Sequence, residues 1–302
     1  MSHRPSREAS DPAAAQPLDE RDLFKWFRQF VIGLQVVCSD GGQLDTTVLS
    51  GFILKHEDLF LWVTAGHCIE ELKRLKSRCA NVGLQWLDEH PNKKAPSLFV
   101  DYDSLIELSF SRNDDQLDVG IVVLRPLWQK AFDSNPAKKW LPEPAWRPVQ
   151  DGCRIRDAFL IGYPHECMQC TEKLVTKAGH RYVRGTSASC YLRVEVIPPR
   201  DSDEYGGFWR KNRIYGRVRV GDDSDGALRS VEGMSGGPLC VIFEQPDGLS
   251  SIRVLGIQSA WVQSVQIVSA TPFDQVANAV EIAAQRIREQ TQDNPPSGRR
   301  SE

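Results

Sequence analysis

The stretch that decides the fold is residues 233–239, GMSGGPL, in which Ser235 stands among three glycines ahead of an apolar run. A serine hydroxyl is a poor nucleophile at neutral pH and needs a neighbouring base to take its proton. Glycines beside the serine let backbone N–H groups turn toward one point without a Cβ clash, as an oxyanion hole requires. A glycine-rich turn with a serine is by itself usually only a turn, so its meaning depends on the rest of the chain.

Two further stretches supply the partners that such a serine needs. In residues 62–68, WVTAGHC, an apolar run ends and His67 follows a small turn. In residues 118–124, DVGIVVL, Asp118 opens an apolar run. Histidine has a suitable pKa to act as a general base, and a carboxylate behind it fixes its tautomer and stabilises the imidazolium. The three stretches together predict a nucleophile, a base and an orienting carboxylate.

In the order histidine, aspartate, serine, these stretches resemble the catalytic motifs of the trypsin/chymotrypsin-like serine proteases. The resemblance implies an all-β fold, a chymotrypsin-like double six-stranded antiparallel β-barrel, with short helices at the N-terminal and C-terminal ends. It also implies that His67 is the general base, that Asp118 orients it, and that Ser235 forms an acyl-enzyme. The N–H groups of Gly233 and Ser235 would form the oxyanion hole.

The same resemblance extends to the substrate side of the site. Residues 256–259, GIQS, resemble the family strand that pairs with the bound substrate, and Ser259 would then support the carboxylate of Asp118. No aspartate stands at the base of the implied pocket, so we expect a preference for small apolar or acidic side chains rather than Lys or Arg. The residues implied to bind substrate are Arg229, Ser230, Gln258, Ser259, Ala260 and Trp261.

Departures from the family pattern indicate which branch of the family the chain resembles. Members activated by a freed N-terminus carry an aspartate before the serine, where this chain has Met234. Secreted members bridge the cysteine after the histidine to a cysteine for which this chain has LSGF at 49–52, so Cys68 has no bridge. These features, with Gly162-Tyr163-Pro164, are similar to the bacterial Deg-type and related intracellular branches. The residues after Ser235 are predicted to leave no room for a PDZ module.

The composition argues against other classes of protein. The chain has 302 residues and a formal net charge of −3, so neither nucleic acid nor an anionic membrane is an expected partner. Its apolar runs are far shorter than the roughly 18–20 residues that span a bilayer. The first residues lack the apolar core of a secretory signal, so we expect a cytoplasmic enzyme with mostly reduced cysteines. The expected partners are a protein or peptide substrate and a regulatory protein, and no cofactor is expected.

Two alternatives stay open at this point. A protease fold that has lost its activity and serves as a protein-binding module would carry the same three stretches. Separately, Cys167 and Cys170 have the spacing of a zinc knuckle or a redox pair. Ordinary thiols are the simpler interpretation, so no metal site is predicted. The further candidate zinc ligands are Cys153, His165, His180 and Cys190.

The predicted organisation alternates between helices, strands and polar segments. Residues 18–29 and 272–289 carry apolar side chains at helical spacing. Six short apolar runs, at 31–38, 47–55, 59–64, 80–87, 105–110 and 119–124, predict the strands of a first barrel. The predicted segments are a disordered tail (1–17), the N-terminal helix and first barrel (18–126), a linker (127–150), the second barrel (151–271), the C-terminal helix (272–290) and a second tail (291–302).

Overall fold

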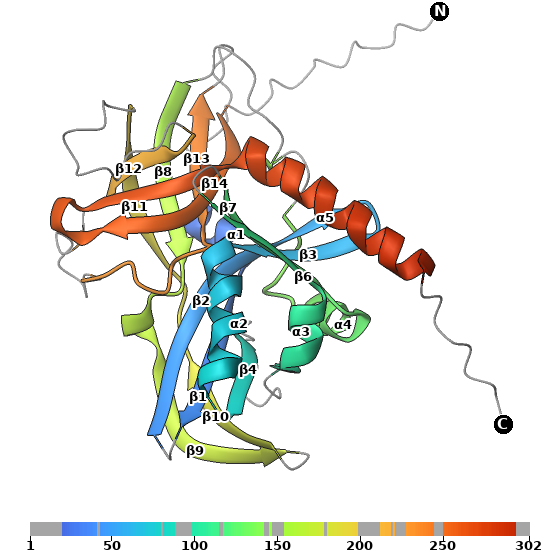
Figure 1. Ribbon diagram of the computed structural model, residues 1–302. Coiled ribbons are helices and arrows are strands. Elements are labelled where there is room, and N and C mark those ends of the chain that lie inside the picture. Colours follow the sequence, from blue (N-terminus) through green and yellow to red (C-terminus); the bar gives the residue numbers. More distant parts are fainter. Residues whose placement is uncertain are drawn as a thin grey trace, which may run out of the picture.

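The computed structural model describes residues 20–40, 43–79, 81–87, 98–114, 117–141, 145–146, 154–177, 180–198, 212–218, 220, 228–244 and 250–293. Within these ranges the strands form a seven-stranded sheet, a closed barrel and a separate hairpin (Figure 1). The predicted N-terminal tail, residues 294–302 of the C-terminal tail, and residues 142–144 and 147–150 of the predicted linker lie outside the described residues.

The seven-stranded sheet is antiparallel, in the order β5-β4-β1-β2-β3-β7-β6. Every residue of β7 is buried, which explains why its sequence after Asp118 is apolar without alternation. Strand β3 pairs with β7, so the segment before His67 lies beside the strand that begins at Asp118. The strands are β1 (Val31–Asp40), β2 (Gln43–His56), β3 (Leu59–Thr64), β4 (Asn81–Leu87), β5 (Leu98–Val100), β6 (Ser109–Asn113) and β7 (Asp118–Val123).

The closed barrel has the strand order β11-β12-β15-β14-β13-β8. The pairing of β14 with β15 shifts register between Gln258 and Ala260, so Ser259 is an extra residue on β14. Its strands are β8 (Arg154–Gly162), β11 (Cys190–Ile197), β12 (Ile214–Val218), β13 (Pro238–Glu244), β14 (Ser250–Val262) and β15 (Ile267–Pro272). The separate hairpin consists of β9 (Gln169–Lys177) and β10 (His180–Thr186).

One apolar core joins the sheet, the barrel and the C-terminal helix. It contains Phe52 and Ile121 from the sheet, Ile161 and Ile257 from the barrel, and Val276 from α5. Burial of this shared surface fixes the two units against each other, and α5 crosses both (Figure 1). The helices are α1 (Glu20–Arg28), α2 (Gly66–Arg78), α3 (Tyr102–Glu107), α4 (Pro126–Asp133) and α5 (Phe273–Asp293), with short 3₁₀ turns η2 (His165–Cys167) and η4 (Gln263–Val265).

The prediction of two six-stranded barrels agrees with the second unit and differs from the first. The first unit has seven strands, and among the described residues its sheet ends at β5 and β6 without closing. Part of the difference from the prediction is local. Residues 105–110 were expected to form one strand. Instead α3 occupies 102–107, with the carboxylate of Asp101 accepting the N–H of Ser104 at its N-terminus, and β6 begins only at Ser109.

Two further helices lie where none was predicted. Helix α4 occupies residues 126–133 at the start of the predicted linker, with Pro126 in its first turn, where a missing N–H costs nothing. Helix α2 begins directly after β3, at Gly66, so His67 lies in its first turn. No helix in the described part of the chain is long and apolar enough to cross a membrane.

Candidate active site

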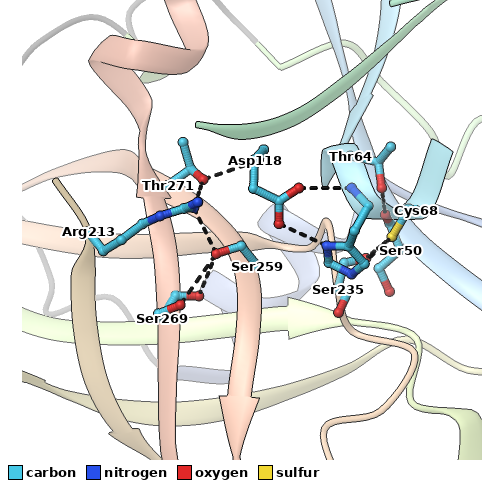
Figure 2. Close-up of polar contacts among 10 residues, drawn as sticks. Ser50, Thr64, Cys68, Asp118, Arg213, Ser235, Ser259, Ser269 and Thr271 are labelled. Carbon is cyan, nitrogen blue, oxygen red and sulfur yellow. Dashed lines mark hydrogen bonds and ion pairs between the residues drawn. The ribbon is translucent and has the colours of Figure 1, made fainter. Parts of the chain in front are cut away.

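Asp118 and His67 form a pair held by two contacts. The Oδ1 atom of Asp118 accepts the backbone N–H of His67 at 2.9 Å, and Oδ2 lies 2.8 Å from the imidazole Nδ1 (Figure 2). Ala65 precedes α2 and has no side chain that caps it, so a carboxylate from β7 serves the helix N-terminus instead. With Nδ1–H donated to the carboxylate, Nε2 is the nitrogen that accepts a proton.

The environment of His67 favours the protonated ring. Burial by itself disfavours the imidazolium, but the hydrogen bond to Asp118 and the contact with Cys68 outweigh it and raise the pKa of His67 from 6.5 to about 10. Asp118 is buried, with 4% of its surface exposed, so its charge is little screened by solvent. The population of the neutral ring, the form that accepts a proton, therefore grows as the pH rises.

Ser235 lies in the second of two successive tight turns. The N–H of Met234 donates to the carbonyl of Val231 at 3.0 Å, and the N–H of Gly237 donates to the carbonyl of Met234 at 2.8 Å. The third residue of each turn is a glycine with positive φ, 86° at Gly233 and 89° at Gly236. Type II turns require this conformation at that position. The spacing of glycines around Ser235 is therefore the local sequence of a double turn.

Two backbone amides of the double turn have no protein partner. The N–H groups of Gly233 and Ser235 meet no acceptor among the residues that the structure describes, whereas the N–H of Met234 between them closes the first turn. Free N–H groups on both sides of one residue are what an oxyanion hole requires.

The serine loop is attached to the first unit through Ser50 on β2. The Ser50 hydroxyl donates to the carbonyl of Gly233 at 2.7 Å, and the Ser50 N–H donates to the carbonyl of Ser235 at 3.2 Å. The carbonyl of Ser50 accepts from the hydroxyl of Thr64, three residues before His67, at 2.7 Å. Ser50 was missed at the sequence level, because a lone serine within a predicted strand carries no signal.

Cys68 lies between the histidine and the serine loop. Its sulfur is 3.7 Å from Nε2 of His67 and 3.7 Å from the main-chain oxygen of Ser235. His67 and Ser235 therefore both contact the sulfur of Cys68 (Figure 2). Cys68 is buried and free, as are Cys38 and Cys240.

The candidate zinc ligands are only partly within the described residues. Cys167 and Cys190 form no disulfide in the described structure, and their sulfurs lie 3.7 Å apart. Cys153 and the side chains of Cys170 and His180 lie outside the described residues. Among those that are described, no group of three metal-ligating side chains gathers.

The expected support of Asp118 by Ser259 is corrected by the geometry. In the described structure the Ser259 hydroxyl donates to the carbonyl of Ser269 at 3.3 Å and accepts from Arg213 at 2.9 Å, away from the Asp118 carboxylate. Thr271 contacts Asp118 instead, with its hydroxyl donating to the Asp118 main-chain carbonyl at 3.1 Å (Figure 2). The register shift on β14 turns Ser259 out of the regular alternation and explains the difference.

The other predicted substrate-binding residues lie on two segments next to the serine loop. Gln258 exchanges backbone hydrogen bonds with the loop, accepting from Gly236 at 2.8 Å and donating to Gly237 at 2.9 Å. Its side chain is buried, and its Oε1 meets no donor among the residues that the structure describes. Ala260 and Trp261 continue β14. Arg229 and Ser230 are held through their backbone N–H groups, which donate to Glu166 Oε1 at 2.6 and 3.3 Å.

Comparisons with known proteins find structural similarity but no matching family model or curated sequence. No protein-family model matches the chain, and no curated protein matches it. Among solved structures, it is similar to the active form of the Rv3671c protease from M. tuberculosis, with a TM-score of 0.40, 17% sequence identity and 92% of each chain covered. A similarity at this level does not define the chemistry of the chain, which has to be argued from its own residues.

Proposed function

We propose that the chain is a chymotrypsin-like serine endopeptidase on a Deg-like intracellular branch. The single observation that carries the proposal is the convergence of the Asp118–His67 pair with a serine loop that has two free amides. Each part comes from a different element, β7, α2 and the turn before β13, and Ser50 and Cys68 hold them together.

In the proposed reaction, the Ser235 Oγ attacks the carbonyl carbon of the scissile peptide bond while its proton passes to Nε2 of His67. Asp118 stabilises the resulting imidazolium, and the N–H groups of Gly233 and Ser235 stabilise the oxyanion. The C–N bond then breaks, and the leaving amine takes the proton from Nε2. Water attacks the acyl-enzyme with His67 again as base, releasing the acid and the Ser235 hydroxyl.

The substrate preference is proposed on the same residues. Gln258 and Ser259 lie beside the nucleophile loop, and Arg229 and Ser230 lie before it, so no carboxylate is available among them to bind a basic side chain. We expect cleavage after small apolar or acidic residues.

Internally quenched peptide libraries test the proposal. Wild type should cleave a subset of peptides, and Ser235→Ala and His67→Ala should not. Ser134→Ala, an exposed serine at the end of α4, is the matched control and should cleave as wild type does. Dominant cleavage after Lys or Arg would contradict the proposed preference. Cleavage that survives in Ser235→Ala would contradict the proposed mechanism.

A further inference from the structure

Arg213 reaches the back of the candidate site from the segment before β12. Because Ile214 pairs with Ala270, Arg213 lies one step beyond the last pair, opposite Thr271 on β15. Its Nη1 donates to the hydroxyl of Thr271 and, at 2.9 Å, to the hydroxyl of Ser259 (Figure 2). The guanidinium is half-buried, and the neighbouring Asn212 carbonyl accepts from Gln275 at the start of α5.

These contacts determine the direction of two hydroxyl protons. A hydroxyl has one proton and two lone pairs, and a guanidinium can only donate. Once Arg213 occupies a lone pair of Thr271, the Thr271 proton turns to the remaining acceptor, the main-chain carbonyl of Asp118, at 3.1 Å. In the same way, the Ser259 proton turns to Ser269, whose main-chain carbonyl lies at 3.3 Å and whose hydroxyl lies at 3.4 Å. Successive donors of this kind strengthen one another in a buried setting.

We propose that Arg213 is a positioning residue, which acts through the hydroxyl of Thr271 to fix the strand end that presents Asp118 to His67. The proposal rests on the proposed hydrolase function of Ser235. Asp118 is the first residue of β7. Its main-chain carbonyl accepts a hydrogen bond from Thr271, which belongs to the barrel rather than to the sheet. Arg213 therefore couples the barrel to the position of the carboxylate, and a small displacement of such a carboxylate costs reaction rate rather than binding.

The test measures the saturation kinetics of a fluorophosphonate probe on the full-length chain, per folded molecule. In Arg213→Met we expect the maximal inactivation rate to fall about 10- to 100-fold, with KI changed less than about 2-fold. Arg213→Lys keeps one donor and should recover part of the rate. Arg217→Met replaces an exposed arginine on β12, and as the matched control it should react as wild type does.

A double-mutant cycle separates positioning from a general effect on packing. Thr271→Val keeps the shape of the side chain and removes the hydroxyl, so it should slow the reaction as Arg213→Met does. The double variant should be no slower than the slower single variant, because Arg213 acts through Thr271. If Arg213→Met fails to fold, Arg213→Lys and Thr271→Val carry the same test.

The outcomes distinguish this proposal from the proposed function. Absence of any probe reaction on folded wild type overturns the hydrolase function. Reaction of wild type with equal maximal rates in Arg213→Met and Arg217→Met overturns the positioning role alone, as do fully additive losses in the cycle.

Discussion

Ser50 and Gly233 are joined by a 2.7 Å hydrogen bond from a β2 side chain to the main chain beside the candidate nucleophile. The same hydroxyl accepts the N–H of Tyr163 at 2.7 Å, and the Ser50 N–H donates to the carbonyl of Ser235 at 3.2 Å. One fully buried serine of the first unit thus holds both sides of the serine loop of the second.

Ser50→Ala should destabilise the protein and slow its reaction. The carbonyl of Gly233 and the N–H of Tyr163 would lose a buried partner, which costs about 1–3 kcal/mol of unfolding free energy. Urea unfolding measures that loss, and probe reaction measures the accompanying misplacement of Ser235. Ser109→Ala, which removes a hydroxyl bonded only to the carbonyl of Ile106, is the control and should react normally. A wild-type rate in Ser50→Ala would contradict the anchoring role.

Gly236→Ala should be more damaging than an ordinary glycine substitution. Gly236 has φ of 89°, and an added Cβ would lie 2.0 Å from Thr64 Oγ1 and 2.2 Å from the carbonyl of Ser50. Backbone strain of this kind costs about 1–3 kcal/mol before the clash is counted. We expect a lower unfolding midpoint and loss of probe reaction; retention of both would show that the double turn tolerates a side chain.

The rate of probe reaction should increase with pH. The midpoint of this increase, the acid limb of the pH profile, should lie above pH 6.5. The His67–Asp118 hydrogen bond and the Cys68 contact overcome burial and raise the pKa of His67 to about 10, and only the neutral ring takes the Ser235 proton. Labelling rates between about pH 6 and about pH 10.5 locate the limb. In Asp118→Asn only the Cys68 contact opposes the effect of burial on the pKa of His67, so the acid limb should move to lower pH, with a lower plateau. A wild-type limb at or below pH 6.5 would contradict the raised pKa.

The same pKa has a consequence for stability. The folded-state value lies above the unfolded value of 6.5, so the stability that His67 contributes is complete below pH 6.5 and is lost as the pH rises through about 10. The difference in unfolding free energy between wild type and His67→Gln should therefore shrink across that window. If the difference in unfolding free energy grows with pH instead, the result would contradict a raised pKa of His67 in the folded protein.

Cys240 should resist alkylation in the folded protein. It is fully buried, and burial raises the pKa of its thiol well above the ordinary value. Iodoacetamide at mildly alkaline pH followed by peptide mapping should modify half-buried Cys79 and Cys167 first, and Cys240 only after unfolding. Early modification of Cys240 would place it outside the core.

The residues that carry chemistry could be predicted because each lies in a short local pattern. The glycines around Ser235 encode two turns, and Asp118 precedes a strand that is buried on both faces. The supporting contacts could not be predicted, because they join residues far apart in the chain, such as Ser50 with Gly233 and Thr271 with Asp118. The role expected for Ser259 failed because a register shift redirects its hydroxyl, and sequence alone does not locate such a shift.

The positions of the strands were predicted better than the closure of the first sheet into a barrel. Apolar runs located most strands, but β5 at one edge of the first sheet was not predicted. At the other edge β6 begins at Ser109, because α3 occupies part of the run that was expected to be a strand. No helix was predicted between the strands expected at 59–64 and 80–87, where α2 lies. Its capping carboxylate, Asp118, comes from a strand that follows much later in the sequence.

Covalent labelling by a fluorophosphonate probe, followed by peptide mapping, tests the central claim most directly. The proposed triad predicts one probe per chain on the peptide that contains Ser235 in wild type, and none in Ser235→Ala or His67→Ala. Folded wild type that takes up no probe, or that takes it up on another serine, would contradict the assignment of Ser235 and favour a protein-binding module built on the same fold.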